Sequence, residues 1–76
     1  MTSVAYVTVG LLQHSPAGTF RRVTTHDAHD VPTGSPPWTS IRSFQQLQRF
    51  VMEHGLDVAD PTHIRLEPGA EHLAIW

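Results

Sequence analysis

The sequence predicts a small α+β domain in which one helix packs on a mostly antiparallel four-stranded sheet. Segments rich in β-branched and aromatic residues stand at both ends of the chain, and a single amphipathic segment lies between them. The expected element order is therefore β-β-α-β-β, and the apolar stripe of the helix needs the inner face of a sheet to cover it. The 76 residues are expected to form one domain, 1–76, with a long Pro- and Gly-containing loop at 26–39.

The first predicted strand lies within residues 4–12. Its odd positions form a continuous apolar row, which is typical of a central strand: Ala5, Val7, Val9 and Leu11. Pro16 and Gly18 then favour a chain reversal. The next segment, 19–25, also has β propensity, but Phe20 and Val23 fall on opposite faces of a regular strand. We expect an edge strand there, with a bulge that accommodates the change of face.

The helix is predicted by its start, its face and its end. Ser43 and Gln46 have the spacing of a capping box. Apolar residues then recur at helical spacing: Phe44, Leu47, Phe50 and Val51. Gly55 supplies a left-handed end, and Leu56 is placed to touch Val51 as in a Schellman cap.

The C-terminal part of the chain predicts a β-hairpin. Ile64 and Leu66 alternate with polar residues before Pro68-Gly69, which marks the turn, and Leu73 and Ile75 alternate after it. The second face of this hairpin would carry His63, Arg65, Glu67, His72 and Trp76. An exposed sheet face normally shows such alternation.

At the level of architecture, this order of elements is similar to the ubiquitin-like β-grasp family. The resemblance rests on element order and not on a sequence motif. The chain ends Leu-Ala-Ile-Trp, where ubiquitin-like modifiers and sulfur carriers carry a Gly-Gly tail. The conjugation chemistry of that family is therefore not expected here.

Composition argues against several classes of function. Five Arg and no Lys oppose seven acidic residues, for a net charge of -2, and the only adjacent basic pair is Arg21-Arg22, so nucleic acid is not the favoured partner. No apolar run approaches the roughly 20 residues that cross a bilayer, and we expect a cytoplasmic protein without a membrane partner. The chain has no Cys, no Lys and no Gly-x-Ser-x-Gly motif. These absences remove several covalent mechanisms and favour a non-enzymatic protein.

The loop at 26–39 contains a candidate metal site. It begins His26-Asp27-Ala28-His29-Asp30, and imidazole and carboxylate groups are ligands for divalent transition metals. The chain is also histidine-rich, with six His in all. The spacing of these groups matches no established metal motif, and Asp27 and Asp30 could instead cap turns. Metal binding by His26, Asp27, His29 and Asp30 is thus one hypothesis.

Aromatic and arginine residues suggest an interaction site. Trp and Tyr anchor many protein interfaces because they bury a large area at small entropic cost, and Arg is enriched there too. The candidate partner-binding residues are Trp38, Trp76, Tyr6, Arg21 and Arg22. The alternative is structural: Trp38 could cover the core beside the helix, and Trp76 could cover the edge of the sheet.

The favoured interpretation is a small accessory or adaptor module. It would act through a protein partner or as a homo-oligomer, because so short a chain buries a limited core and an edge strand at 19–25 could be completed by another chain. A metal-binding or metal-dependent protein is the first alternative. Weak nucleic-acid binding through Arg21, Arg22 and Tyr6 is the second.

Overall fold

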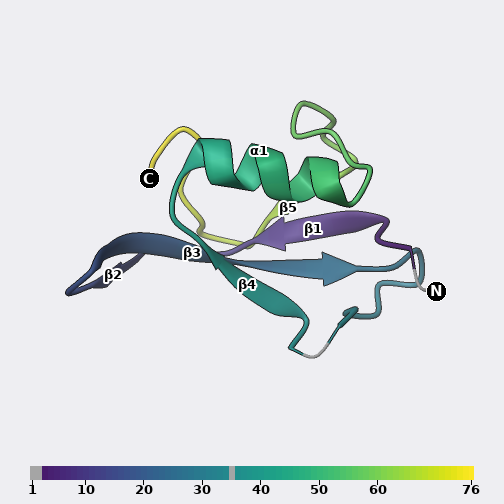
Figure 1. Ribbon diagram of the computed structural model, residues 1–76, viewed down its shortest axis with the longest axis horizontal. Helices are drawn as coiled ribbons and strands as arrows, with labels where there is room; N and C mark the ends of the chain where they lie inside the picture. Colours follow the sequence, from purple (N-terminus) through teal and green to yellow (C-terminus); the bar gives the residue numbers. More distant parts are fainter. Residues whose placement is uncertain (1–2, 35) are drawn as a thin grey trace.

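The computed structural model describes residues 3–34 and 36–76, and it confirms the α+β class: one helix packs against a mixed sheet (Figure 1). The elements are β1 (Tyr6–Val9), β2 (Gln13–Ser15), β3 (Gly18–His26), β4 (Trp38–Ile41), α1 (Phe44–Glu53) and β5 (Ile64–Leu66). The sheet has five strands where four were expected, and four of them precede the helix where two were expected.

The first two predicted strands form one long hairpin, and the bulge lies on the opposite side from the one expected. Val9 of β1 pairs with Val23 of β3, and Gln13 of β2 pairs with Phe20 of β3. Residues 10–12 lie between these pairs on the first side, whereas only Arg21 and Arg22 lie between them on β3. The extra residue ends β1 at Val9, so only residues 6–9 of the predicted strand 4–12 are a strand; β2 begins after that prediction, and β3 is continuous.

The expected edge strand at 19–25 is the centre of the sheet. Val23 and Thr24 of β3 pair with β1 and also with β4, so β1 and β4 flank β3 on its two sides. The strand that was not predicted, β4, comes from the end of the predicted loop 26–39 and the residues just after it. The edges of the main sheet are consequently β4 and β5.

The predicted C-terminal hairpin is wrong. β5 runs parallel to β1, with Val7 N–H donating to the His63 carbonyl and Glu67 N–H donating to the Val9 carbonyl. Parallel strands need a crossover connection, which here contains α1. The turn at Pro68-Gly69 is present, but residues 70–76 form no strand after it. Their carbonyls are used instead by a buried arginine, as described below.

The core lies between α1 and one face of the sheet. Eight buried apolar side chains form it: Val7, Val9, Val23, Ile41, Leu47, Val51, Leu56 and Ile64. Figure 1 shows α1 lying across this face, with the opposite face of the strands turned away from the helix. Residues that alternate with the core positions therefore point to that opposite face, among them Tyr6, Arg22, Trp38 and Arg65.

Both predicted helix caps are present. Ser43 Oγ accepts a hydrogen bond from Gln46 N–H at 3.2 Å. The Gln46 side chain accepts from Arg42 N–H at 2.8 Å, so the returning bond reaches one residue further back than a capping box requires. At the other end, Leu56 N–H donates to the Val51 carbonyl while Gly55 has φ of 75°, which is a Schellman cap.

Candidate functional site

Strand β4 presents an open hydrogen-bonding edge. Thr25 N–H donates to the Pro37 carbonyl at 3.0 Å, which makes Thr25 and Pro37 a hydrogen-bonded pair. In an antiparallel ladder such pairs recur at every second residue, so Thr39 and Ile41 direct their backbone groups towards β3. Trp38 and Ser40 direct theirs outward, away from the sheet. Among the described residues, β3 is the only strand that pairs with β4.

The local sequence determines how far this edge extends. The next outward N–H, that of Arg42, is already bonded to the Gln46 side chain of α1. Before Trp38, Pro36 and Pro37 have no N–H to donate. The open edge is therefore limited to Trp38 and Ser40. No charged residue occurs within β4, although charged side chains are a common means of preventing strand addition at an edge.

Two hollows lie beside this edge and share Thr39 and Phe50. One, of about 220 Å³, lies where the prolines before β4 meet the end of the helix, and Pro37, Trp38 and His54 are among the residues that line it. The other, of about 240 Å³, continues along the helix past Ile41, Arg49 and Glu53. Together they form a groove with β4 on one side and α1 on the other. An extended peptide added to β4 would lie in this groove.

Two of the predicted partner-binding residues lie at the rim of the site. Trp38 is 41% exposed, and the Arg22 guanidinium carbon stands 4.5 Å from the centre of its ring. The paired cation holds the indole in place while leaving much of its surface open to solvent. Trp38 thus contributes both an exposed aromatic surface and an outward backbone group to the β4 edge.

Tyr6, also predicted to bind a partner, is occupied within the fold. It is 7% exposed, its ring stacks on His26 at 4.8 Å, and the Arg65 guanidinium carbon lies 4.0 Å from the ring centre. Its hydroxyl donates to Asp30 Oδ1 at 2.7 Å, and this hydrogen bond raises the pKa of Tyr6. A ring packed against two neighbours is not available to stack on a nucleic-acid base, which removes the main aromatic element of the nucleic-acid hypothesis.

The four predicted metal ligands are used in different ways. Asp27 Oδ1 accepts from the N–H groups of His29 and Val31, which is the turn-capping alternative. Asp30 accepts from Tyr6 and lies 3.9 Å from Arg65, and the His26 ring stacks on Tyr6. Within residues 3–34 and 36–76, no group of three or more His, Asp or Glu side chains is arranged to hold a metal ion. Metal binding in this loop has no geometric support in the described arrangement.

Arg21 and Trp76 hold the C-terminal segment in place. Arg21 is fully buried, and its guanidinium donates to the carbonyls of Glu71, His72 and Ile75 at 2.7 to 2.8 Å. The same guanidinium lies 5.0 Å from the centre of the Trp76 ring, and Trp76 packs against the core. The structure therefore assigns Arg21 an internal role in place of the predicted contact with a partner.

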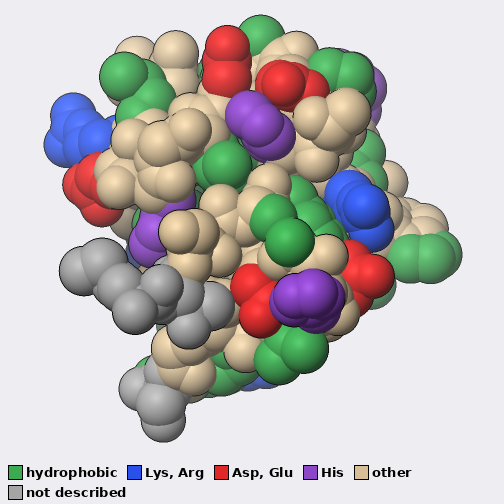
Figure 2. Space-filling view, turned by 90° about the vertical axis from the view of Figure 1, so that its right-hand side faces the viewer, with side chains coloured by type: hydrophobic (Ala, Val, Ile, Leu, Met, Phe, Trp, Pro, Cys, Tyr) green, Lys and Arg blue, Asp and Glu red, His purple; other side chains and the backbone are tan. Residues whose placement is uncertain are grey.

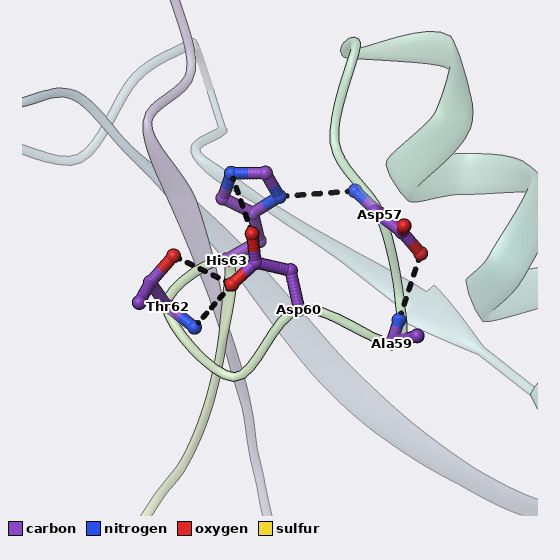
Figure 3. A network of polar contacts seen from close by, with 5 residues as sticks. All are labelled: Asp57, Ala59, Asp60, Thr62 and His63. Carbon is purple, nitrogen blue, oxygen red and sulfur yellow. Dashed lines mark hydrogen bonds and ion pairs between the residues drawn. The ribbon is translucent and has the colours of Figure 1, made fainter.

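A further polar cluster lies in the connection between α1 and β5. His63 Nδ1 accepts from Asp57 N–H at 3.1 Å, and its Nε2 lies 3.6 Å from Asp60 Oδ2 (Figure 3). Asp60 also accepts from the Thr62 hydroxyl and N–H, and these bonds lower its pKa. Every one of these contacts closes a local turn, so the cluster is explained by the crossover loop that it shapes.

Acidic and histidine side chains gather on the end of the molecule that faces the viewer in Figure 2. The His63 cluster and the Asp27 turn both belong to loops, and neither lines the β4 groove. The groove is therefore chemically distinct from these acidic loops.

The β4 edge was not predicted, because Trp38 and Thr39 lie within the predicted loop 26–39. The four residues of β4 show no alternation of polar and apolar side chains that would have predicted a strand. No helix of the described chain is long and apolar enough to cross a membrane. Comparisons with protein-family models, with curated proteins and with solved structures gave no match.

Proposed function

We propose that this protein is a small non-enzymatic interaction module that takes an extended segment of a protein partner as an added strand on β4. One observation carries the proposal: Trp38 and Ser40 direct their backbone N–H and C=O groups outward beside a groove. Strand addition supplies affinity through main-chain hydrogen bonds and specificity through side-chain pockets. The β4 edge would provide the main-chain hydrogen bonds, and the two hollows would provide the side-chain pockets.

The dimensions of the β4 groove also support an interaction role at this site. The buried core contains eight apolar side chains, and the two hollows beside β4 are open grooves of 220 and 240 Å³. Both lie below the usual range of about 300–1,000 Å³ for pockets that enclose a small molecule. A groove of this kind accommodates side chains of a peptide.

The test is a proline at an outward position of β4. Ser40→Pro removes an N–H that points away from β3, so the β3–β4 ladder keeps its hydrogen bonds, and edge strands tolerate proline at such positions. Ser40→Ala is the matched control because it keeps the N–H. Peptides selected from a random displayed library on the wild-type protein should bind Ser40→Ala equally well and Ser40→Pro at least about ten-fold more weakly.

The location of binding gives an independent readout. In ¹H–¹⁵N spectra of the full chain, selected peptides should shift the amides of β4 and α1. Equal binding to both variants, or amide shifts confined to the acidic loops, would contradict strand addition at β4. Sedimentation of the protein alone tests self-association: a dimer that Ser40→Pro dissociates would identify a second copy of this chain as the added strand.

A further inference from the structure

The β4 groove differs in charge from the rest of the molecule. The whole protein has a net charge of -2, with five Arg against seven acidic residues. Two of the five Arg place their side chains at this site: Arg22 pairs with Ser40 and stands over Trp38, and Arg49 lines a hollow. Arg21 pairs with Ile41 but donates to the C-terminal segment, and the Arg42 guanidinium reaches the Ala17 carbonyl beyond β4. Within the described chain, Glu53 is the only acidic residue that lines either hollow. The site is therefore locally basic in an acidic protein.

The positive charges lie on both sides of an added strand. Side chains of such a strand alternate between the two faces of the sheet. Those that point towards α1 would enter the groove beside Arg49, and those that point away would lie beside Trp38 and Arg22. Next to Arg49, the hollow lined by Pro37, Trp38 and Phe50 is suited to one apolar side chain.

We propose that the segment taken at β4 is acidic, with carboxylates on both faces and one apolar residue that fills the hollow beside Phe50. This inference rests on the proposed function and names the chemistry of its partner. The carboxylates would meet Arg49 on the helix side and Arg22 on the opposite side. Complementary charge of this kind suppresses unsuitable partners and accelerates association.

The probe is a fluorescently labelled peptide of about eight residues, alternating glutamate and valine around one central phenylalanine. Its matched control carries lysine in place of glutamate. The acidic peptide should bind the full-length protein at least about ten-fold more tightly than the lysine peptide, as measured by fluorescence anisotropy. Its affinity should decrease as the ionic strength rises, since partly exposed charges are screened by salt.

Charge variants locate the contacts. Arg49→Gln and Arg22→Gln should each lower the affinity for the acidic peptide by about three-fold or more, which is the effect expected for a charge at the rim of an interface. Arg65→Gln is the matched control, because Arg65 belongs to β5 at the opposite edge of the main sheet, and it should leave the affinity unchanged. Glu53→Gln should leave binding unchanged or strengthen it.

The outcomes separate this inference from the proposed function. If the lysine peptide binds as tightly as the acidic one and Ser40→Pro abolishes both, the acidic preference is overturned while strand addition stands. If the acidic peptide binds wild type and Ser40→Pro equally, binding at the β4 edge is overturned, and this inference with it. Failure of both peptides to bind, or a dimer that occupies β4 with a second copy of the chain, also overturns the acidic segment as the occupant.

Discussion

Arg21 shows how one buried charge organises a segment that has no regular secondary structure. Its guanidinium donates to three carbonyls of residues 71–75, and its Nε atom is buried without a partner among the described atoms. Burial lowers the pKa of Arg21, although an arginine stays charged at neutral pH. The three bonds bring the C-terminal segment onto the core, and this explains why that segment does not pair as a strand.

Replacing Arg21 by Met should destabilise the protein by about 2–4 kcal/mol, because three part-buried hydrogen bonds to the carbonyls of the C-terminal segment would be lost. Arg22→Met is the matched control, since Arg22 is exposed, and it should cost about 1 kcal/mol or less. Urea unfolding of both variants measures the difference. An equal decrease in the free energy of unfolding for the two variants would contradict the role assigned to Arg21.

Among the elements, α1 is the one whose limits follow most directly from local chemistry. Ser43 starts it, and Gly55 ends it in a left-handed conformation with φ of 75°. No atom outside the neighbouring residues lies within 4 Å of the position that a Cβ on Gly55 would take. A substitution there is consequently strained by its backbone conformation and not by a steric clash.

Gly55→Ala should therefore lower the free energy of unfolding by about 1 kcal/mol. Gln48→Ala, an exposed change in the middle of α1, is the control and should have little effect, because Ala favours the helix. Thermal unfolding followed by circular dichroism compares the two. An unchanged midpoint for Gly55→Ala would show that the left-handed cap does not limit stability.

In contrast to α1, the formation of β4 depends on a strand that is distant in the sequence. Its four residues contain no pattern long enough to distinguish a strand from a loop, and its partner, β3, lies twelve or more residues earlier in the chain. β4 is an edge strand only because β3 pairs with β1 on its other side and so lies at the centre of the sheet. Sequence reasoning identified Trp38 and Arg22 as candidates, but it could not place them together beside an open edge.

Across the whole molecule, acidic side chains close the loops. Asp27 accepts hydrogen bonds from the N–H groups of Val31 and His29. Asp60 accepts hydrogen bonds from the hydroxyl and the N–H of Thr62. Glu71 accepts a hydrogen bond from Leu12 N–H. These bonds lower the pKa of all three carboxyl groups. The charged form is therefore favoured in the folded state.

The sign of the pH dependence follows from these shifts. A carboxyl group whose pKa is lowered by folding contributes stability above its ordinary value, here 3.8 for Asp and 4.5 for Glu, and that stability is lost as the pH falls further. The thermal midpoint should therefore fall as the pH decreases below this range. A triple variant, Asp27→Asn, Asp60→Asn and Glu71→Gln, keeps an acceptor oxygen at each position and should show a flatter decline. Parallel curves for the two proteins would contradict this origin of acid sensitivity.

The sequence by itself determined the α+β class, the helix with both of its caps, residues 6–9 of the first predicted strand and the turn at Pro68-Gly69, because each depends on residues close together in the chain. The tertiary structure decided that β3 is central, that β5 is parallel to β1, and that residues 70–76 follow Arg21 instead of pairing as a strand. It also decided which predicted site residues are accessible, leaving Trp38 and Arg22 exposed while burying Arg21 and Tyr6. Strand partners and burial depend on contacts between distant parts of the chain, which local pattern and propensity do not encode.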